Sequence, residues 1–407
     1  MNVVQRFRYE RRWTRLHGRP AVAIFLWSRA AIWLGALWAL MWSEPKPPPL
    51  QRLWDSPFLH DLGFGSDVWA RWDSGWFLRI AEHGYASQQG TAAFYPLYPG
   101  LVAVLGRAFG GHFLLAGLLL SLACCLASFV LLYRLAAPRL GEDGAARAVL
   151  YLAVFPMSLF LQAVYAESLY LACVLAAFLL AERGRFVWAG AFAGLALLTR
   201  PVAVALLLAL AWLAWRSASR WRNLAALCIA PLMFAAYPLG LQWQIHDWRA
   251  FLHTESLWHR KLSPAGPFGG IWDGLHAGWE GIRQLVSGSG RHVYWPIEHG
   301  EPLHVASVNV EALGFLLVFL WLTWLTWRRL GTAYGIFAAA SLAIPLSVPS
   351  GRFPLLSLPR FGLVVFPFFL ALALVGARPR AHAAIVGVSA VFLGIVVVQW
   401  TLWQWVS

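Results

Sequence analysis

The chain has 407 residues, of which 60% are hydrophobic and only 12% are charged. An average soluble domain carries about 25% charged residues, so this chain has about half the usual charge. Apolar runs of about 20 residues, the length that crosses a bilayer, recur along nearly the whole sequence. The composition therefore excludes a single water-soluble globule and predicts an all-α polytopic membrane protein.

The net charge of +14 does not indicate nucleic-acid binding. The basic residues stand in short blocks between apolar runs, as they do in the cytoplasmic loops of membrane proteins. No phosphate-binding glycine loop, zinc-finger spacing or RNA-binding signature accompanies them. The four cysteines lie inside apolar runs, and the adjacent pair Cys124 and Cys125 can hardly form a disulfide. We therefore expect no disulfide framework.

The chain opens with an Arg-rich arm, 1–19, which we expect to stay in the cytoplasm. The first span covers 20–42 and runs outward from there. It is too long for a cleaved signal peptide and has no small-residue cleavage site, so we interpret it as retained. Arg29 lies within this span, and its long side chain is expected to reach toward the inner headgroups.

The next segment, 43–111, is predicted to be an extracytoplasmic loop. Within it, 94–110 is apolar but short, and it is interrupted by Pro96, Pro99 and Arg107. If this stretch crossed the membrane, every later basic loop would fall on the wrong side. We therefore expect an interfacial or re-entrant helix inside the first outer loop.

The remaining spans then follow a consistent pattern. A transmembrane bundle covers 112–243, a second extracytoplasmic loop covers 244–305, and C-terminal transmembrane helices cover 306–407. The regions 147–182 and 186–215 each divide into two helices with almost no loop. This arrangement has about eleven spans, a cytoplasmic N-terminus and an outer C-terminus, and it places the positive excess inside.

The first candidate site is Arg71-Trp72-Asp73-Ser74-Gly75-Trp76-Phe77, which continues through Arg79, Glu82, His83, Gly84 and Tyr85. A carboxylate between aromatic and basic neighbours at the membrane surface suits a general base, which takes a proton from an acceptor hydroxyl. Alternatively, Asp73 pairs with Arg71 or caps the helix that follows it. From these residues alone both interpretations stay open.

Three further sites fall on the same outer side. Glu167, in Tyr165-Ala166-Glu167-Ser168, is either placed by the dipole of the helix that begins there or binds a polar substrate. Arg200, in Thr199-Arg200-Pro201, lies at another helix break. Arg360, in Ser357-Leu358-Pro359-Arg360-Phe361, follows Arg352. Outer arginines bind lipid headgroups nonspecifically or clamp the phosphate of a lipid-linked substrate.

Metal sites are not indicated. The second outer segment is rich in histidine and basic residues, but no pair has a metal-ligand spacing. These residues are His246, His253, His259, Arg260, Lys261, His276, His292, His299 and His304. The Asp-x-Asp element of nucleotide-sugar enzymes is also absent from the sequence. We therefore expect no obligatory metal and no cofactor.

The first motif, together with Ala93-Phe94-Tyr95-Pro96-Leu97-Tyr98-Pro99, resembles the signature of the PIG-V family. That family contains GPI mannosyltransferase II and its prokaryotic relatives, within the GT-C superfamily of membrane glycosyltransferases. Tyr165 to Tyr170, the stretch 194–201, and Pro359-Arg360-Phe361 with Phe366-Pro367 look similar to its later motifs. The likeness covers about 70–205 and, more loosely, the last hundred residues.

The resemblance implies a GT-C-like fold and a polyprenyl-phosphate sugar donor, with mannose as the sugar. It implies transfer with inversion on the extracytoplasmic face of a bacterial plasma membrane, to a lipid, glycan or protein acceptor. Asp73 matches the general base of such enzymes. We assign Arg360 and Arg200 to the donor phosphate. Contacts with sugar or acceptor are assigned to Arg71, Trp72, Glu82, His83, Tyr85 and Glu167.

Two other classes of function compete with this one. A transporter or flippase of lipid-linked sugars would also need many spans and outer arginines. The sequence shows no inverted repeat and no matched pair of broken helices, which such transporters usually carry. A non-catalytic partner in an envelope-assembly complex would use the same motifs structurally.

Overall fold

The computed structural model describes residues 18–44, 59–88, 90–288, 290, 301–351 and 353–406. Most of the cytoplasmic arm, the start of the first outer loop, and the residues His292, His299 and Arg352 lie outside these ranges. In the described part, the chain is built from helices, with one isolated antiparallel bridge between Arg260 and Ser350.

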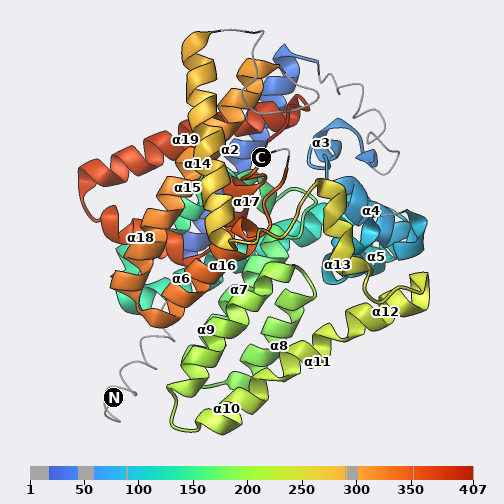
Figure 1. The fold of residues 1–407 in the computed structure, drawn as a ribbon, viewed down its shortest axis with the longest axis vertical. Helices are drawn as coiled ribbons and strands as arrows, with labels where there is room; N and C mark the ends of the chain where they lie inside the picture. Colours follow the sequence, from blue (N-terminus) through green and yellow to red (C-terminus); the bar gives the residue numbers. More distant parts are fainter. Residues whose placement is uncertain are drawn as a thin grey trace.

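The N-terminal half, shown from blue to green in Figure 1, contains a first long helix, a group of short helices and a broken bundle. Its first elements are α2 (Arg19–Trp42), α3 (Phe64–Asp67), α4 (Ser74–His83), η2 (Tyr85–Ser87), η3 (Thr91–Ala93) and α5 (Leu97–Ala108). Next come α6 (Phe113–Val154), η4 (Ser158–Leu161), α7 (Glu167–Glu182), α8 (Phe186–Leu197), η5 (Pro201–Ala203) and α9 (Val204–Trp215).

The helices of the C-terminal half pack against those of the N-terminal half. It contains α10 (Arg220–Leu227), α11 (Ile229–Phe234), α12 (Ala236–Ile245), α13 (Ala250–His253), η6 (Thr254–Trp258) and α14 (Pro267–Ser287). These are followed by α15 (Pro302–Leu330), α16 (Thr332–Leu346), α17 (Leu358–Leu363), α18 (Pro367–Val375) and α19 (Pro379–Thr401). The long helices α14 and α15 lie side by side in Figure 1.

Within the described ranges, five helical segments are long and apolar enough to cross a membrane. They are Arg19–Trp42, Phe113–Val154, Arg220–Ile245, Pro302–Leu330 and Pro379–Thr401. Large apolar side chains such as Leu26, Trp27 and Leu34 are exposed on their outer faces, where lipid and not water is a suitable solvent. The chain is therefore an integral membrane protein, and the count of about eleven spans stays a prediction.

Breaks in the helices decide the shape of the bundle. The helix α6 is interrupted at Gly141, whose φ of +72° is left-handed and is accessible to glycine at little cost. The chain then leaves helical geometry again between Val154 and Glu167, and a third time between Leu197 and Val204. Because of these breaks, polar residues come to lie between apolar helices.

The helix α5 occupies the stretch expected to be interfacial. Its 12 residues span about 18 Å, which is too short for a hydrocarbon core of about 30 Å. It packs against α4 and α6. The backbone N–H of Leu97, at its start, donates to the carbonyl of Leu198 over 2.9 Å. The first outer loop is thereby joined to the break between α8 and α9.

The position of Arg29 differs from the expectation. Its side chain does not extend to the inner headgroups but is buried in the bundle. The guanidinium donates to the carbonyls of Ser158 (2.9 Å) and Ala153 (3.2 Å) and to the Ser158 hydroxyl (2.8 Å). Because α6 ends at Val154, its last carbonyls have no partner in the helix, and a cation there satisfies them.

Replacing Arg29 by Met tests this role. The apolar side chain has a similar length but leaves these buried carbonyls unpaired. We expect the free energy of unfolding to fall by about 2–3 kcal/mol, as for hydrogen bonds to a charged group. The measurement is denaturant unfolding in detergent, with Arg19→Met at the start of the same helix as the matched control. Equal stability of the two variants would contradict the assignment.

Candidate active site

A cavity of about 330 Å³ lies where the breaks of the bundle meet the first outer loop. Its charged lining residues are Asp73, Glu167, Arg200, Arg260 and Arg360. The rest of the wall is mainly aromatic and aliphatic, and includes Trp72, Phe77, Phe94, Tyr95, Phe160, Tyr165, Phe361 and Trp405. Three arginines and two carboxylates leave one positive charge in excess. The apolar walls keep the local dielectric constant low, and this strengthens the attraction between the cavity and an anionic ligand.

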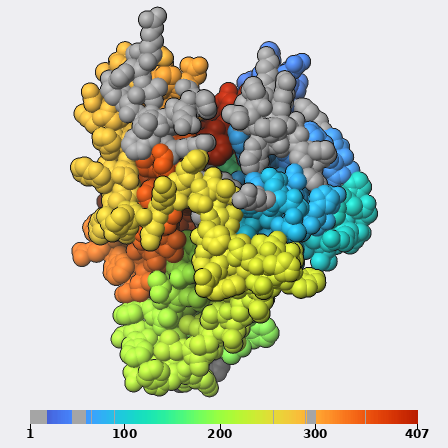
Figure 2. Space-filling view, turned by 45° about the vertical axis from the view of Figure 1, so that its right-hand side comes forward, coloured from blue at the N-terminus to red at the C-terminus, as the bar shows by residue number. Residues whose placement is uncertain are grey.

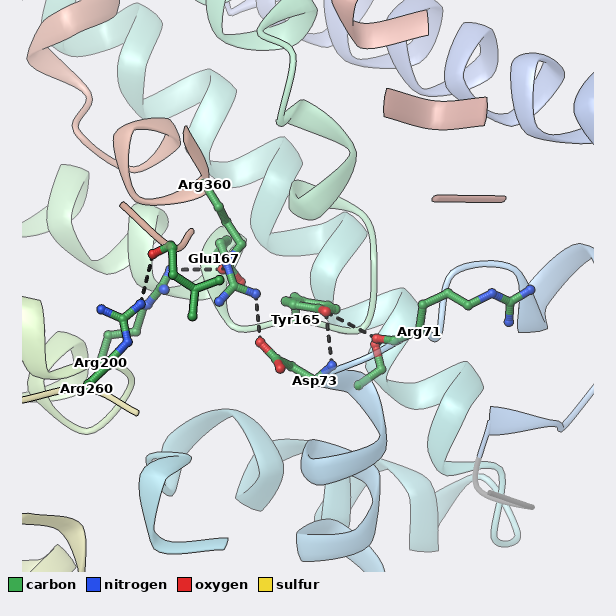
Figure 3. A network of polar contacts seen from close by, with 9 residues as sticks. Arg71, Asp73, Tyr165, Glu167, Arg200, Arg260 and Arg360 are labelled. Atoms are coloured by element: carbon green, nitrogen blue, oxygen red, sulfur yellow. Dashed lines mark hydrogen bonds and ion pairs between the residues drawn. The ribbon is translucent and has the colours of Figure 1, made fainter. Parts of the chain in front are cut away.

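Asp73 is directed into the cavity and does not cap its helix. It occupies the N-cap position of α4, but its side chain makes no capping hydrogen bond. Instead, Oδ2 accepts a hydrogen bond from Nη1 of Arg360 over 2.7 Å (Figure 3). The interpretation of Asp73 as a helix cap is therefore wrong, because the carboxylate is used in a contact between residues 287 positions apart.

The turn that carries Asp73 is held by Tyr165. The Tyr165 hydroxyl donates to the carbonyl of Arg71 over 3.2 Å and accepts the backbone N–H of Asp73 over 3.1 Å. Trp72, between these two residues, has a left-handed φ of +53°, a strained conformation for a bulky side chain. Burial, followed by the Asp73 charge, raises the pKa of Tyr165, so the hydroxyl keeps the proton that it donates.

Arg360 joins two carboxylates. Besides Asp73, its guanidinium faces Glu167, with 3.5 Å between Nε and Oε1. Burial alone would lower the pKa of Arg360, but the negative charges of Asp73 and Glu167 outweigh burial and raise it. The arginine is therefore charged under all ordinary conditions, and it lies over the rings of Phe160 and Tyr165.

Glu167 is the first residue of α7, and its side chain is only 3% exposed. Its Oε1 also accepts from Nη1 of Arg200 over 3.0 Å. Arg200 precedes η5 at the break between α8 and α9. Arg200 and Arg360 thus provide the counter-charges that a buried carboxylate needs.

Arg260 is a cavity residue that the sequence did not single out. It was one of many basic residues in the second outer segment and belongs to no motif. Its guanidinium donates to the carbonyls of Val348 (3.2 Å) and Leu356 (2.9 Å). It lies 5.5 Å from the Phe361 ring, and Arg200 lies 5.4 Å from the same ring. Two arginines from distant segments therefore flank one aromatic side chain beside Arg360.

The segment after α19 closes another side of the cavity, which no sequence pattern indicated. Trp405 and Val406 line it, and the Trp405 ring packs against Trp72 with 4.9 Å between centroids. On the face shown in Figure 2, C-terminal residues in red appear between the orange and yellow helices and the blue ones. The end of the described chain therefore meets the first outer loop at the site.

Four residues expected to contact sugar or acceptor are not part of the cavity lining. Arg71 is directed away from it, donating to the carbonyls of Asp67 (2.9 Å) and Ala70 (3.1 Å) (Figure 3). Glu82 and His83 are exposed at the end of α4. The Tyr85 hydroxyl is buried and donates to the carbonyl of Phe94. Asp73 lies at the start of α4, whereas Glu82 and His83 lie at its far end, Tyr85 follows in η2 and Arg71 precedes the helix.

The described ranges hold no group of three or more His, Cys, Asp and Glu side chains arranged around a common point. Asp73 and Glu167 instead share Arg360 as their counter-charge. Independence from metal ions stays a prediction.

A double-mutant cycle tests the link between Arg360 and Asp73. Arg360→Gln leaves the Asp73 carboxylate without its partner, and Asp73→Asn removes the charge that needs it. We expect the double variant to be more stable than the sum of the single effects by about 1–2 kcal/mol. The pair of Arg283 and Glu280 within α14 is the control, and we expect a smaller coupling there because the Arg283 side chain is half exposed to solvent. Additive unfolding energies would rule out the link.

The chain is similar to one known protein family and to solved structures. Residues 96–241 match the family model described as dolichyl-phosphate-mannose-protein mannosyltransferase. ArnT from Cupriavidus metallidurans bound to undecaprenyl phosphate is 16% identical with a TM-score of 0.47, covering 89% of this chain and 62% of that one. The oligosaccharyltransferase AglB from Archaeoglobus fulgidus, in complex with an inhibitory peptide and a dolichol-phosphate, is 14% identical with a TM-score of 0.42. That likeness covers 93% of this chain and 56% of AglB.

This chain thus spans less than two thirds of the length of these two proteins. No curated protein is significantly similar to it in sequence. The family match contains Tyr165, Glu167 and Arg200, three of the residues that line the cavity. The match is limited to residues 96–241 and does not single out the PIG-V branch.

Proposed function

We propose that the chain is an inverting membrane glycosyltransferase that moves mannose from a polyprenyl-phosphate donor to an extracytoplasmic acceptor. The observation that carries the proposal is the Asp73 carboxylate, held 2.7 Å from Arg360 in a cavity with further arginines. The matched family supports the donor class, because its name describes a dolichyl-phosphate-mannose-dependent enzyme. Together with the PIG-V-like motifs, it favours mannose as the sugar.

The charge of the cavity suits such a donor. A polyprenyl-phosphate sugar is a phosphodiester with one negative charge, and the cavity has one positive charge in excess. Arg360 and Arg200 bind its phosphate in this proposal, and Arg260 adds a third guanidinium. Arginine presents several donors in a plane and matches phosphate geometry well. The aromatic and aliphatic walls pack against the sugar and the first isoprene units in this proposal.

Arg360 also controls the base. In the structure its guanidinium holds the Asp73 carboxylate in an ion pair, with 2.7 Å between Nη1 and Oδ2. When the donor phosphate takes over the guanidinium, Asp73 becomes free to accept a proton. In this proposal Asp73 acts as the base only after the donor has bound, and before that its carboxylate stays paired with Arg360.

In the transfer step one bond forms, one bond breaks and one proton moves. The acceptor oxygen forms a bond to the anomeric carbon, and the bond from that carbon to the phosphate oxygen breaks on the opposite face. The acceptor proton passes to Asp73, and polyprenyl phosphate leaves with one more negative charge. Arg360, Arg200 and Arg260 stabilise this charge as it develops, so that the leaving group needs no proton. Glu167 holds the arginines in place and is available to hydroxyl groups of sugar or acceptor.

The direction of the helices supports an extracytoplasmic position for the cavity. From Glu167 at the cavity, α7 runs to Glu182, beyond which follow Arg183 and Arg185. The helix α9 likewise runs from the cavity toward Arg216. Since basic residues are retained on the cytoplasmic side, the opposite ends of these helices face outward. In a bacterium this membrane is the plasma membrane, and the acceptor is a lipid, glycan or protein.

Asp73→Asn tests the assignment of the base. The amide keeps the shape of the side chain but cannot take up the proton, so turnover should fall at least about a hundredfold. Binding of undecaprenyl phosphate should remain, because the arginines are unchanged. The measurement is release of polyprenyl phosphate from polyprenyl-phosphate mannose by purified protein in lipid, with EDTA present.

Asp247→Asn, an exposed carboxylate of the second outer segment, is the matched control and should retain full turnover. A transporter or an assembly partner would bind the lipid in the same way with or without Asp73. Equal release by wild type and Asp73→Asn would therefore exclude the proposed base. Loss of activity on adding EDTA would overturn independence from metal ions.

Tyr165→Phe tests how the base is positioned. The variant loses the hydroxyl that joins the Arg71 carbonyl to the Asp73 N–H, and the aromatic packing stays. We expect kcat to fall about tenfold with the donor KM nearly unchanged, the effect of losing about 1.4 kcal/mol. Tyr334→Phe removes a hydroxyl bonded to Glu182 at the far end of α7 and serves as control. An unchanged kcat in Tyr165→Phe would exclude this positioning role.

A further inference from the structure

A second, smaller cavity of about 50 Å³ lies directly beside the first. The two share part of their walls, namely Leu356, Ser357, Trp405 and Val406. This partition consists of the segment before α17 and the segment after α19. The second cavity is therefore separated from the first by only a few side chains, and α15 and α19 line its other sides.

Polar side chains enter this cavity along one stripe of α15. His304, Ser307 and Glu311 line it and follow one another at three and four residues, a spacing that places them on one face of the helix. Gln399, two residues before the end of α19, lines it from another side. The proposed function uses none of these groups.

The Glu311 carboxylate distinguishes the stripe from ordinary helix surface. It lies nine residues into α15, which is about 13 Å along a helix apolar enough to span the membrane. Other shielded acids of the described chain have a cation beside them: Glu167 has Arg200, and Glu182 has Arg139. Glu311 is partly buried and has no hydrogen bond or ion pair with the residues that the structure describes.

An ionisable group at such a depth is costly, and proteins retain one there mainly where it lines a functional cavity. Charge then determines what this cavity accepts. With His304 neutral, its lining carries one negative charge, opposite in sign to the excess in the larger cavity. A phosphate is attracted to the larger cavity and repelled from the smaller one. Hydroxyl groups are favoured in the smaller one, because a carboxylate accepts strong hydrogen bonds from them.

We propose that the cavity around Glu311 is an acceptor subsite, which binds a hydroxyl-bearing part of the acceptor. This inference rests on the proposed function, since it divides the two substrates of the transfer between the two cavities. A volume of about 50 Å³ holds a single small polar group. The cavity thus anchors one hydroxyl of a polyol or sugar acceptor, while another hydroxyl reaches Asp73 across the partition. Trp405 and Ser357 lie between the two groups.

The experiment uses the full chain in lipid nanodiscs, with octyl mannoside as acceptor probe and polyprenyl-phosphate mannose as donor. Glu311→Gln keeps the size of the side chain and removes its charge, and Gln399→Ala changes the other side of the cavity. We expect both to raise the KM and the Kd for octyl mannoside, the first by at least about tenfold, as for a lost charged hydrogen bond. Glu301→Gln, at the exposed start of the same helix, should match wild type.

Release of polyprenyl phosphate without acceptor is measured in parallel and should be equal in all these variants, because the donor cavity is intact. An unchanged Kd for octyl mannoside in Glu311→Gln and Gln399→Ala would overturn the subsite, as would failure of wild type to bind the probe. Absence of donor turnover in wild type, with binding of the probe that still depends on Glu311, would instead overturn the proposed function and leave the subsite in place.

Discussion

One largely shielded cation, Arg360, holds three distant segments of this structure together. Its guanidinium lies between the Asp73 and Glu167 carboxylates and therefore joins α17, the start of α4 and the start of α7. Burying three charges in an apolar bundle is costly unless each has a partner at short distance. The requirement fixes the relative positions of three segments that are far apart in the sequence, and it places the first outer loop against the bundle.

The helix breaks make this contact possible. A regular apolar helix satisfies its own backbone and offers no polar atoms to a neighbour, which suits the lipid-facing spans. Asp73, Glu167 and Arg200 instead lie where helices begin or end. Arg360 follows Ser357, which has a left-handed φ of +63°. At the other face of the same region, Arg29 satisfies the carbonyls that the end of α6 leaves open. The charged groups that meet at the larger cavity thus come from places where the helices are interrupted.

The two adjoining cavities extend this organisation. The larger one has an excess of arginine, and the smaller one contains the Glu311 carboxylate, which has no ion pair with another described residue. Their shared partition is formed by Leu356, Ser357, Trp405 and Val406. In the proposed reaction, the anionic lipid-linked donor and the hydroxyl-bearing acceptor must each bind in its own cavity. Opposite charges on the two sides of a thin partition provide this selection, and the partition residues come from segments next to α17 and α19.

The sequence by itself determined the helical membrane class, because the length and the charge of each apolar run are local properties. It also indicated Asp73, Glu167, Arg200 and Arg360, since charged residues at breaks between apolar helices are costly and need a function. Only the tertiary structure decided which side chains meet. Arg71, Glu82, His83 and Tyr85 belong to the same motif as Asp73, yet the fold of the turn, of α4 and of η2 keeps them out of the cavity lining. Arg260, Glu311 and Trp405 belong to no motif and reach the two cavities through long-range packing, which no local pattern encodes.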